Sequence, residues 1–149
     1  MINKNLLLLD TCNTHSVGCN FNTLINLRKC TDDRMLYILI NCGSLVYDKI
    51  GESNILPVAM NYNPHSIANG LSLSMIAKIP GARLTMDTEA EKSIIVRLDG
   101  VRKFKFKECA DGLYYYDTSE SNNTNSSVNN YSNLSSFKLL INSVSNNKK

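Results

Sequence analysis

The chain has 149 residues, of which 43% are hydrophobic, and its net charge is +3 at neutral pH. This length fits one ordinary domain, or a slightly smaller domain followed by a tail. The weak charge gives no reason to expect a nucleic acid or an anionic membrane as a partner, because phosphate binding needs a clustered basic face.

The first predicted element is the apolar run Leu6–Leu9, which leads directly into Asp10. A continuous run of this kind is typical of a strand that is buried on both faces. The next prediction is a hairpin, in which Met35–Ile40 and Leu45–Tyr47 flank the turn signal Asn41–Ser44. We therefore expect the N-terminal half to be built from strands.

Further strands and one helix are expected beyond the hairpin. Asn54–Met60 reads as a strand that contains Pro57, which places it at an edge or a bulge. Only Ser66–Ile79 carries helical spacing, and Gly70 costs this helix about 1 kcal/mol, so we expect a short helix that begins at or after Asn69. Four more short strands are expected at 82–87, 93–98, 102–107 and 112–117. Many short strands with regular turns predict an all-β fold, a small barrel with one helix.

The segment Val101–Glu108 alternates cations with Phe104 and Phe106. This alternation predicts first a strand with one buried and one solvated face. Nucleic-acid contact is the lesser interpretation, and we expect no nucleic acid as a partner of this domain.

The patterned body ends near Asp117. Residues 118 to about 136 are rich in Asn and Ser and cannot bury enough surface to offset the entropy of ordering. We therefore divide the chain into a domain at 1–117 and a linker with the start of a further segment at 118–149, and expect a disordered C-terminal tail.

Cysteine content and the lack of sorting signals indicate an intracellular, cytoplasmic protein. We find neither a secretory leader nor an apolar stretch near the ~20 residues of a membrane helix, so no membrane is expected as a partner. The odd set of Cys12, Cys19, Cys30, Cys42 and Cys109 fits reduced thiols better than a disulfide framework. Cys12, His15, Cys19 and Cys30 could be metal ligands, but structural zinc sites favour two tight pairs. We expect no metal and no cofactor.

The order of these motifs resembles the retropepsin-like protease region of copia-type retrotransposon Gag-Pol polyproteins. In that family an apolar strand runs into Asp-Thr, here Asp10-Thr11, and a later hairpin is the flap, here with Asn41, Cys42 and Gly43 at its tip. A segment P-x-x-I-x-N-x-L-S-L follows the flap and a G-L-Y strand closes the region. These are filled here by Pro64, Ile67, Asn69, Leu71, Ser72 and Leu73, and by Gly112, Leu113 and Tyr114. The resemblance covers about residues 5–117 and implies a small closed β-barrel of the retropepsin type, with a pre-integrase segment starting in 118–149.

The resemblance implies an aspartic endopeptidase that cuts its own polyprotein. Such chemistry needs two carboxylates that share one proton, one acting as base on a water and the other as acid on the carbonyl. Asp10 is the only Asp that a buried strand delivers into a loop, so its counterpart must come from a second chain across a two-fold axis. The resemblance makes Thr11 the residue that ties the two active loops together. It makes the hairpin a flap that closes over an extended polypeptide substrate.

Two positions depart from the family pattern. Cys12 stands where the Asp-Thr triplet usually has glycine, and the flap tip carries Cys42-Gly43 where close relatives usually have two glycines. Two alternatives therefore stay open: a catalytically inactive β-barrel remnant of a decayed element, and a dimeric peptide-binding module. Without the downstream motifs, Asp10 is more simply an Asx-turn residue. For an active element, the resemblance also implies location in a virus-like particle.

Overall fold

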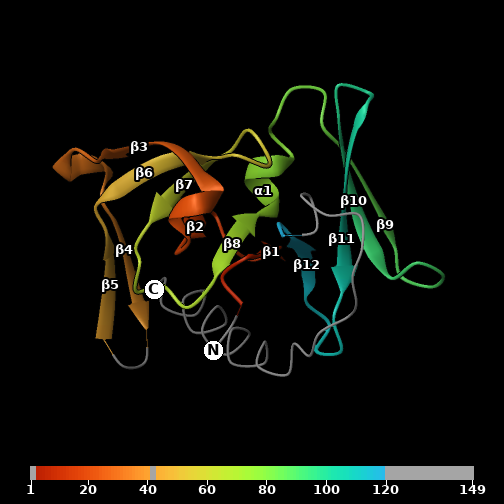
Figure 1. Ribbon diagram of the computed structural model, residues 1–149, viewed down its shortest axis with the longest axis horizontal. Helices are drawn as coiled ribbons and strands as arrows, with labels where there is room; N and C mark the ends of the chain where they lie inside the picture. Colours follow the sequence, from red (N-terminus) through yellow and green to blue (C-terminus); the bar gives the residue numbers. More distant parts are fainter. Residues whose placement is uncertain (1–2, 41–42, 120–149) are drawn as a thin grey trace.

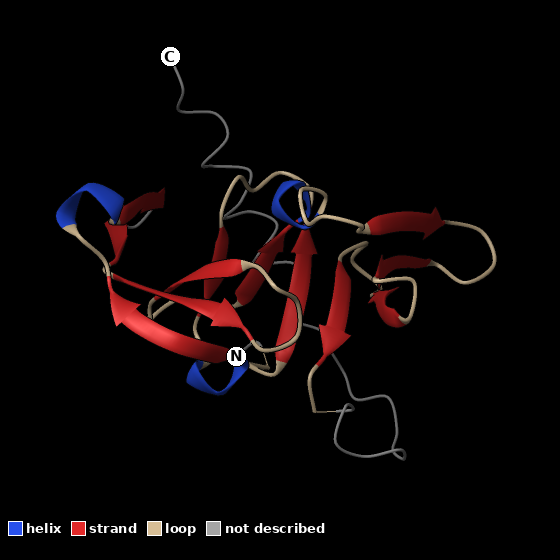
Figure 2. Ribbon diagram, turned by 90° about the horizontal axis from the view of Figure 1, so that it is seen from above, coloured by secondary structure: helices blue, strands red, loops and turns tan. Residues whose placement is uncertain are grey.

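The computed structural model describes residues 3–40 and 43–119, and these residues are mostly β (Figures 1 and 2). The strands are β1 (Leu6–Asp10), β2 (Ser16–Gly18), β3 (Leu24–Lys29), β4 (Leu36–Ile40), β5 (Gly43–Tyr47), β6 (Lys49–Ser53), β7 (Ala59–Tyr62), β8 (Asn69–Ser72), β9 (Arg83–Asp87), β10 (Ser93–Leu98), β11 (Arg102–Glu108) and β12 (Tyr114–Asp117). The helical elements are α1 (Leu73–Ile76) and the 3-10 turns η1 (Phe21–Thr23) and η2 (Asp32–Arg34). None of the helices in this part of the chain is long and apolar enough to cross a membrane.

Ten strands form one mixed sheet in the order β3-β6-β7-β2-β8-β1-β12-β11-β10-β9, and β4 and β5 form a separate hairpin. The expectation of a closed barrel is wrong, because this sheet is open. Its two terminal strands, β3 and β9, lie at opposite ends of the molecule's long axis (Figure 1) and do not pair with each other. The physical reason is that β9, β10 and β11 continue the sheet outward from β12 and never turn back towards β3.

Several predicted elements are confirmed. The apolar run forms β1, the hairpin forms β4 and β5, and the last four predicted strands form β9 to β12. Asp99 and Gly100, which join β10 to β11, both have positive φ (56° and 69°), as the tight hairpin turns with twist matched to the strands require. The tail expected to be disordered lies, from residue 120 on, outside the described residues.

Two boundaries are wrong. The strand predicted at 54–60 exists only from Ala59, because the Ser53 hydroxyl caps the amides of Ile55 and Leu56 and so turns the chain ahead of Pro57. The predicted helix is only α1, since Asn69–Ser72 is the strand β8, which lies between β1 and β2. Much of the segment that has helical spacing in the sequence is therefore a strand, which pairs with β1 and β2.

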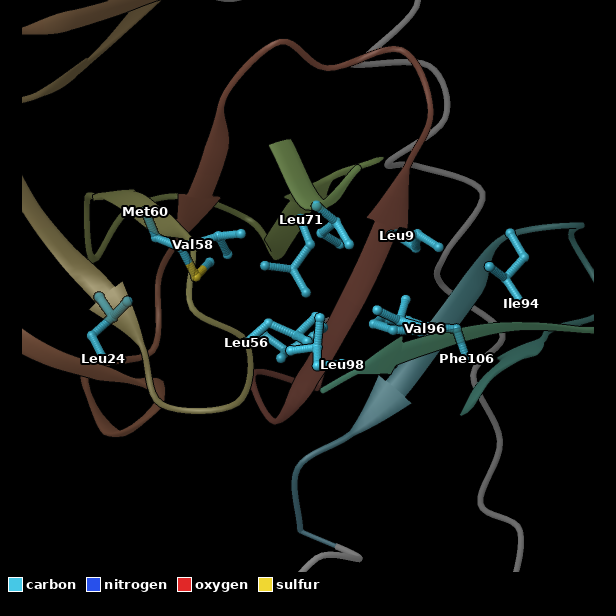
Figure 3. Packing of buried hydrophobic residues seen from close by; sticks show 12 residues of the cluster. Leu9, Leu24, Leu56, Val58, Met60, Leu71, Ile94, Val96, Leu98 and Phe106 are labelled. Carbon is cyan, nitrogen blue, oxygen red and sulfur yellow. The ribbon is translucent and has the colours of Figure 1, made fainter. Parts of the chain in front are cut away.

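The core lies on both faces of β1, as the continuous apolar run predicted. Leu7 and Leu9 belong to the main cluster, whereas Leu8 packs on the other face with Ala68. Figure 3 shows side chains from five strands, Leu9, Met60, Leu71, Val96 and Phe106, gathered in that main cluster. Full burial of each such side chain contributes about 1.5–3 kcal/mol. Asp10 therefore lies at the end of a strand whose residues are all buried.

Candidate active site

Asp10 is the last residue of β1 and pairs in register with Ser72 of the parallel strand β8. Only 7% of its surface is exposed. Its Oδ1 accepts a hydrogen bond of 2.8 Å from the Cys12 backbone amide, which makes an Asx turn. Its Oδ2 is buried and has no hydrogen-bond partner among the described residues. The Asx-turn interpretation therefore accounts for one carboxylate oxygen and leaves the other unexplained.

Burial raises the pKa of Asp10 above its ordinary value, because removal from water disfavours the charged carboxylate. The backbone amides of Cys12 and Asn13 act in the opposite direction and lower it, but burial is the larger influence. A buried carboxylate oxygen without a partner costs free energy of the order of 1–3 kcal/mol or more. This site therefore favours either a proton on Asp10 or a further group that donates to Oδ2.

The loop after Asp10 is fastened to the start of α1. The Ser72 hydroxyl donates to the Asn13 carbonyl and caps the helix by accepting from the Met75 amide at 3.3 Å. The Ser72 amide donates in turn to the Ser16 hydroxyl at 2.9 Å. Sequence analysis did not identify this role. A serine directly before a helical segment is an N-cap signal, and that signal could have found Ser72.

Asn69 ties the other end of β1 to its neighbours. Its amide nitrogen donates to the carbonyls of Lys4 (2.7 Å) and Leu6 (3.1 Å). Its side-chain oxygen accepts from the amides of Cys19 (2.8 Å) and Asn20 (3.0 Å). All four bonds lie around a fully buried side chain, so this residue sets the positions of β1 and β2 relative to β8.

Thr11 and Cys12 are exposed, and their side chains lie near each other, with Thr11 Oγ1 3.7 Å from Cys12 Sγ. Only the backbone amide of Cys12 bonds to Asp10. Among the described residues other than glycine, φ is positive at Asn26, Lys92 and Asp99. Cys12 therefore does not use the left-handed backbone that only glycine adopts readily, and within one chain a side chain is tolerated at this position.

The predicted flap is a hairpin anchored at its base. The buried Tyr47 hydroxyl donates to Ser66 Oγ at 3.0 Å, and the Asn63 side chain donates to the Val46 carbonyl at 2.8 Å. Gly43 has a φ of +141° and open space around it, whereas the other predicted tip residues, Asn41 and Cys42, lie outside the described residues. Figure 1 shows the hairpin at one end of the molecule. No hydrogen bond between described residues joins it to the Asp10 loop, so the structure does not bring these two sets of predicted site residues together.

The possible metal ligands are not brought together either. Cys19 and Cys30 are buried, whereas Cys12 is exposed, and all three are free thiols. His15 contacts Thr14, with Nδ1 3.0 Å from the threonine hydroxyl. Within residues 3–40 and 43–119, no group of three or more His, Cys, Asp and Glu side chains is arranged to hold a metal ion.

Comparison of the chain with protein-family models, with curated proteins and with solved structures gave no match. The resemblance to a family therefore rests on the sequence motifs alone. The main feature of the site is the buried Asp10 carboxylate at the end of β1. One of its oxygens accepts a hydrogen bond, and the other has no partner among the described residues.

Proposed function

We propose that this chain is one half of a retropepsin-type aspartic endopeptidase, which hydrolyses peptide bonds of its own polyprotein with a water activated by an Asp dyad across a homodimer. The observation that carries this proposal is the buried, unpaired Oδ2 of Asp10. The described residues of one chain leave the hydrogen-bonding capacity of this oxygen unfilled. The influences on the Asp10 pKa are burial and two backbone amides, with no other carboxylate among them in the described part of the chain.

In the proposed dimer, the two Asp10 carboxyl groups share one proton, because like charges at such a distance do not both ionise. The ionised carboxylate takes a proton from the attacking water as the oxygen bonds to the scissile carbon. The protonated carboxyl gives its proton to the carbonyl oxygen. In the collapse of the tetrahedral intermediate, the carboxyl that took the water's proton gives it to the leaving nitrogen as the carbon–nitrogen bond breaks, and the other, now ionised, carboxylate takes a proton from a hydroxyl of the intermediate. Burial of Asp10 supports the protonated member of the pair, and the Cys12 amide fixes the direction of its Oδ1.

The β4–β5 hairpin is the proposed flap over a polypeptide substrate. Its two strands pair only with each other among the described strands, so their outer edges offer backbone groups to an extended peptide. One of its faces carries Tyr37 and Leu39, each 62% exposed, together with Val46 opposite Tyr37. An apolar, exposed hairpin of this kind gains by covering a bound peptide. Thr11 is proposed to join the two active loops across the dimer.

The test compares the full chain with its Asp10→Asn variant and with Asp32→Asn as the matched control. Asp32 is an exposed acid in η2, so its substitution makes the same change of charge away from the site. Each protein is incubated with an unstructured polypeptide over a range of pH, and products are identified by mass spectrometry. We expect cleavage by the wild type and the control, and its loss in Asp10→Asn. Cleavage that survives in Asp10→Asn contradicts an aspartic mechanism. If the wild type cleaves nothing, the proposal that the chain is an endopeptidase is contradicted.

A further inference from the structure

Cations that are distant in sequence meet on one face of β9, β10 and β11. In the strand register, Arg97 of β10 lies opposite Arg83 of β9 and opposite Lys103 of β11. Direct cross-strand partners project from the same side of a sheet, so these three side chains form one row across three strands. Arg97 Nη1 donates a hydrogen bond of 3.0 Å to Thr85 Oγ1. Thr85, two residues after Arg83 in β9, therefore lies on the same side of the sheet.

The positive row extends along β11, because Lys105 and Lys107 follow Lys103 at the two-residue spacing of one strand face. We call these five residues, Arg83, Arg97, Lys103, Lys105 and Lys107, the basic face. Lys105 forms an ion pair of 2.9 Å with Glu91. Two further acids, Asp87 and Glu89, lie at this end, and Asp87 accepts from the amides of Glu89 and Ala90. Glu91 also attracts Lys103, which helps to lower the pKa of Glu91. Within the described residues, no ion pair involves the row of Arg83, Arg97 and Lys103.

Within the basic face, Arg83, Lys103 and Lys107 are exposed, and Arg97 and Lys105 are half-buried. The alternate residues of the same strands, including Val96, Leu98 and Phe106, point into the core. Ile95 is the one large apolar residue on the outer side of these strands, and it is only 8% exposed. Tight protein–protein interfaces are centred on buried apolar and aromatic anchors, and the basic face offers no exposed anchor of that kind.

We propose that the basic face binds the phosphate backbone of nucleic acid without sequence preference. Neutralising phosphates with Lys and Arg supplies essentially all of the free energy of non-specific nucleic-acid binding. Neighbouring strands are about 4.8 Å apart and positions two residues apart along a strand are about 7 Å apart. The backbone therefore sets out these cations as an array that can neutralise several phosphates at once. This departs from the sequence-based expectation, which found no clustered basic face. The fold creates one by adding two arginines, from β9 and β10, to the lysines of β11.

The test is the fluorescence anisotropy of a labelled single-stranded RNA of about 20 nucleotides, titrated with the full chain at several salt concentrations. With three phosphates neutralised, the slope of log affinity against log salt is about −2, so affinity falls about 20-fold between about 50 and about 200 mM salt. The variant that replaces Arg83, Arg97 and Lys103 with Gln is expected to remove most of the binding and of the salt slope. The control replaces Lys29, Lys49 and Lys78, three exposed cations elsewhere, with Gln and is expected to keep both.

Arg97 bonds to Thr85, so the triple variant could lose stability; the double variant Arg83→Gln with Lys103→Gln leaves that bond intact. It is expected to weaken RNA binding several-fold with an unchanged circular dichroism spectrum. Equal loss of binding in the Lys29, Lys49 and Lys78 control overturns the proposal, because general charge then explains the affinity. No RNA binding at low salt also overturns it. So does tighter binding to phosphatidylserine vesicles or to polyglutamate than to RNA, since the occupant is then a membrane or an acidic protein.

Discussion

Replacing Asn69 with Ala should strongly destabilise the fold, because this one side chain satisfies four backbone groups. Its four bonds join the carbonyls of Lys4 and Leu6 to the amides of Cys19 and Asn20 around a fully buried position. Each hydrogen bond contributes about 0.5–1.5 kcal/mol net, so loss of the four bonds is expected to cost about 2–6 kcal/mol. That is a large part of the stability of an ordinary domain.

The measurement is urea unfolding followed by circular dichroism, with Asn54→Ala as the control. Asn54 makes one exposed side-chain bond, to the Asn22 carbonyl at 2.9 Å, so its loss should cost less than about 1 kcal/mol. Asn69→Asp sharpens the test, since a carboxylate there faces two carbonyls and needs a proton to donate to either. Burial beside two carbonyl oxygens is expected to raise the pKa of that carboxyl in the folded chain, so the variant should recover stability as pH falls. A loss below about 1 kcal/mol in Asn69→Ala would refute the bridging role of this side chain.

Three further predictions follow from single contacts. Tyr47→Phe removes the hydroxyl that donates to Ser66 and should cost about 1 kcal/mol in urea unfolding; an unchanged stability would mean that this bond does not anchor the hairpin. Ser72→Ala removes the helix cap and the bond to the loop after Asp10 and should cost about 1–2 kcal/mol. Ser44→Ala, at an exposed position of β5, should be nearly neutral; equal losses would contradict the capping role. Burial raises the folded pKa of Asp10 above its unfolded value near 3.8, so the native chain binds this proton more tightly. The stability that the proton contributes is complete below the unfolded pKa and declines as pH rises through the folded pKa. The free energy of unfolding of Asp10→Asn, relative to that of wild type, should therefore increase as pH is raised from about 4 towards neutrality. A difference between the two proteins that does not change with pH would contradict the desolvation of Asp10.

Elements marked by a strong local pattern were predictable, and those made by neighbouring strands were not. Four leucines before Asp10 indicated a buried strand, and β1 is one. The strand β3 was missed because Asn26, at a φ of +54°, interrupts it and shifts its register against β6. The strand β8 was missed because Asn69 and Gly70 have low strand propensity; it is β1 and β2 on either side that hold them extended.

The same distinction applies to the sites. Asp10 could be singled out from its place at the end of an apolar run. The N-cap signal could mark Ser72, but its bond to the loop after Asp10 could not be predicted, because Ser72 and Asn13 lie 59 residues apart in the sequence. The basic face also depends on the register of β9 and β10 against β11, and no local pattern contains that register. Closure into a barrel was expected from strand number and turn spacing, which do not determine where the outermost strands end.

The central claim, that two chains share one catalytic site, is tested most directly by mixing wild type with Asp10→Asn at constant total protein and measuring the cleavage rate. When subunits exchange, only pairs of two wild-type chains hold a complete dyad, so an equal mixture should retain about one quarter of the wild-type rate. A rate of about one half would show that each chain works alone and would contradict the shared site.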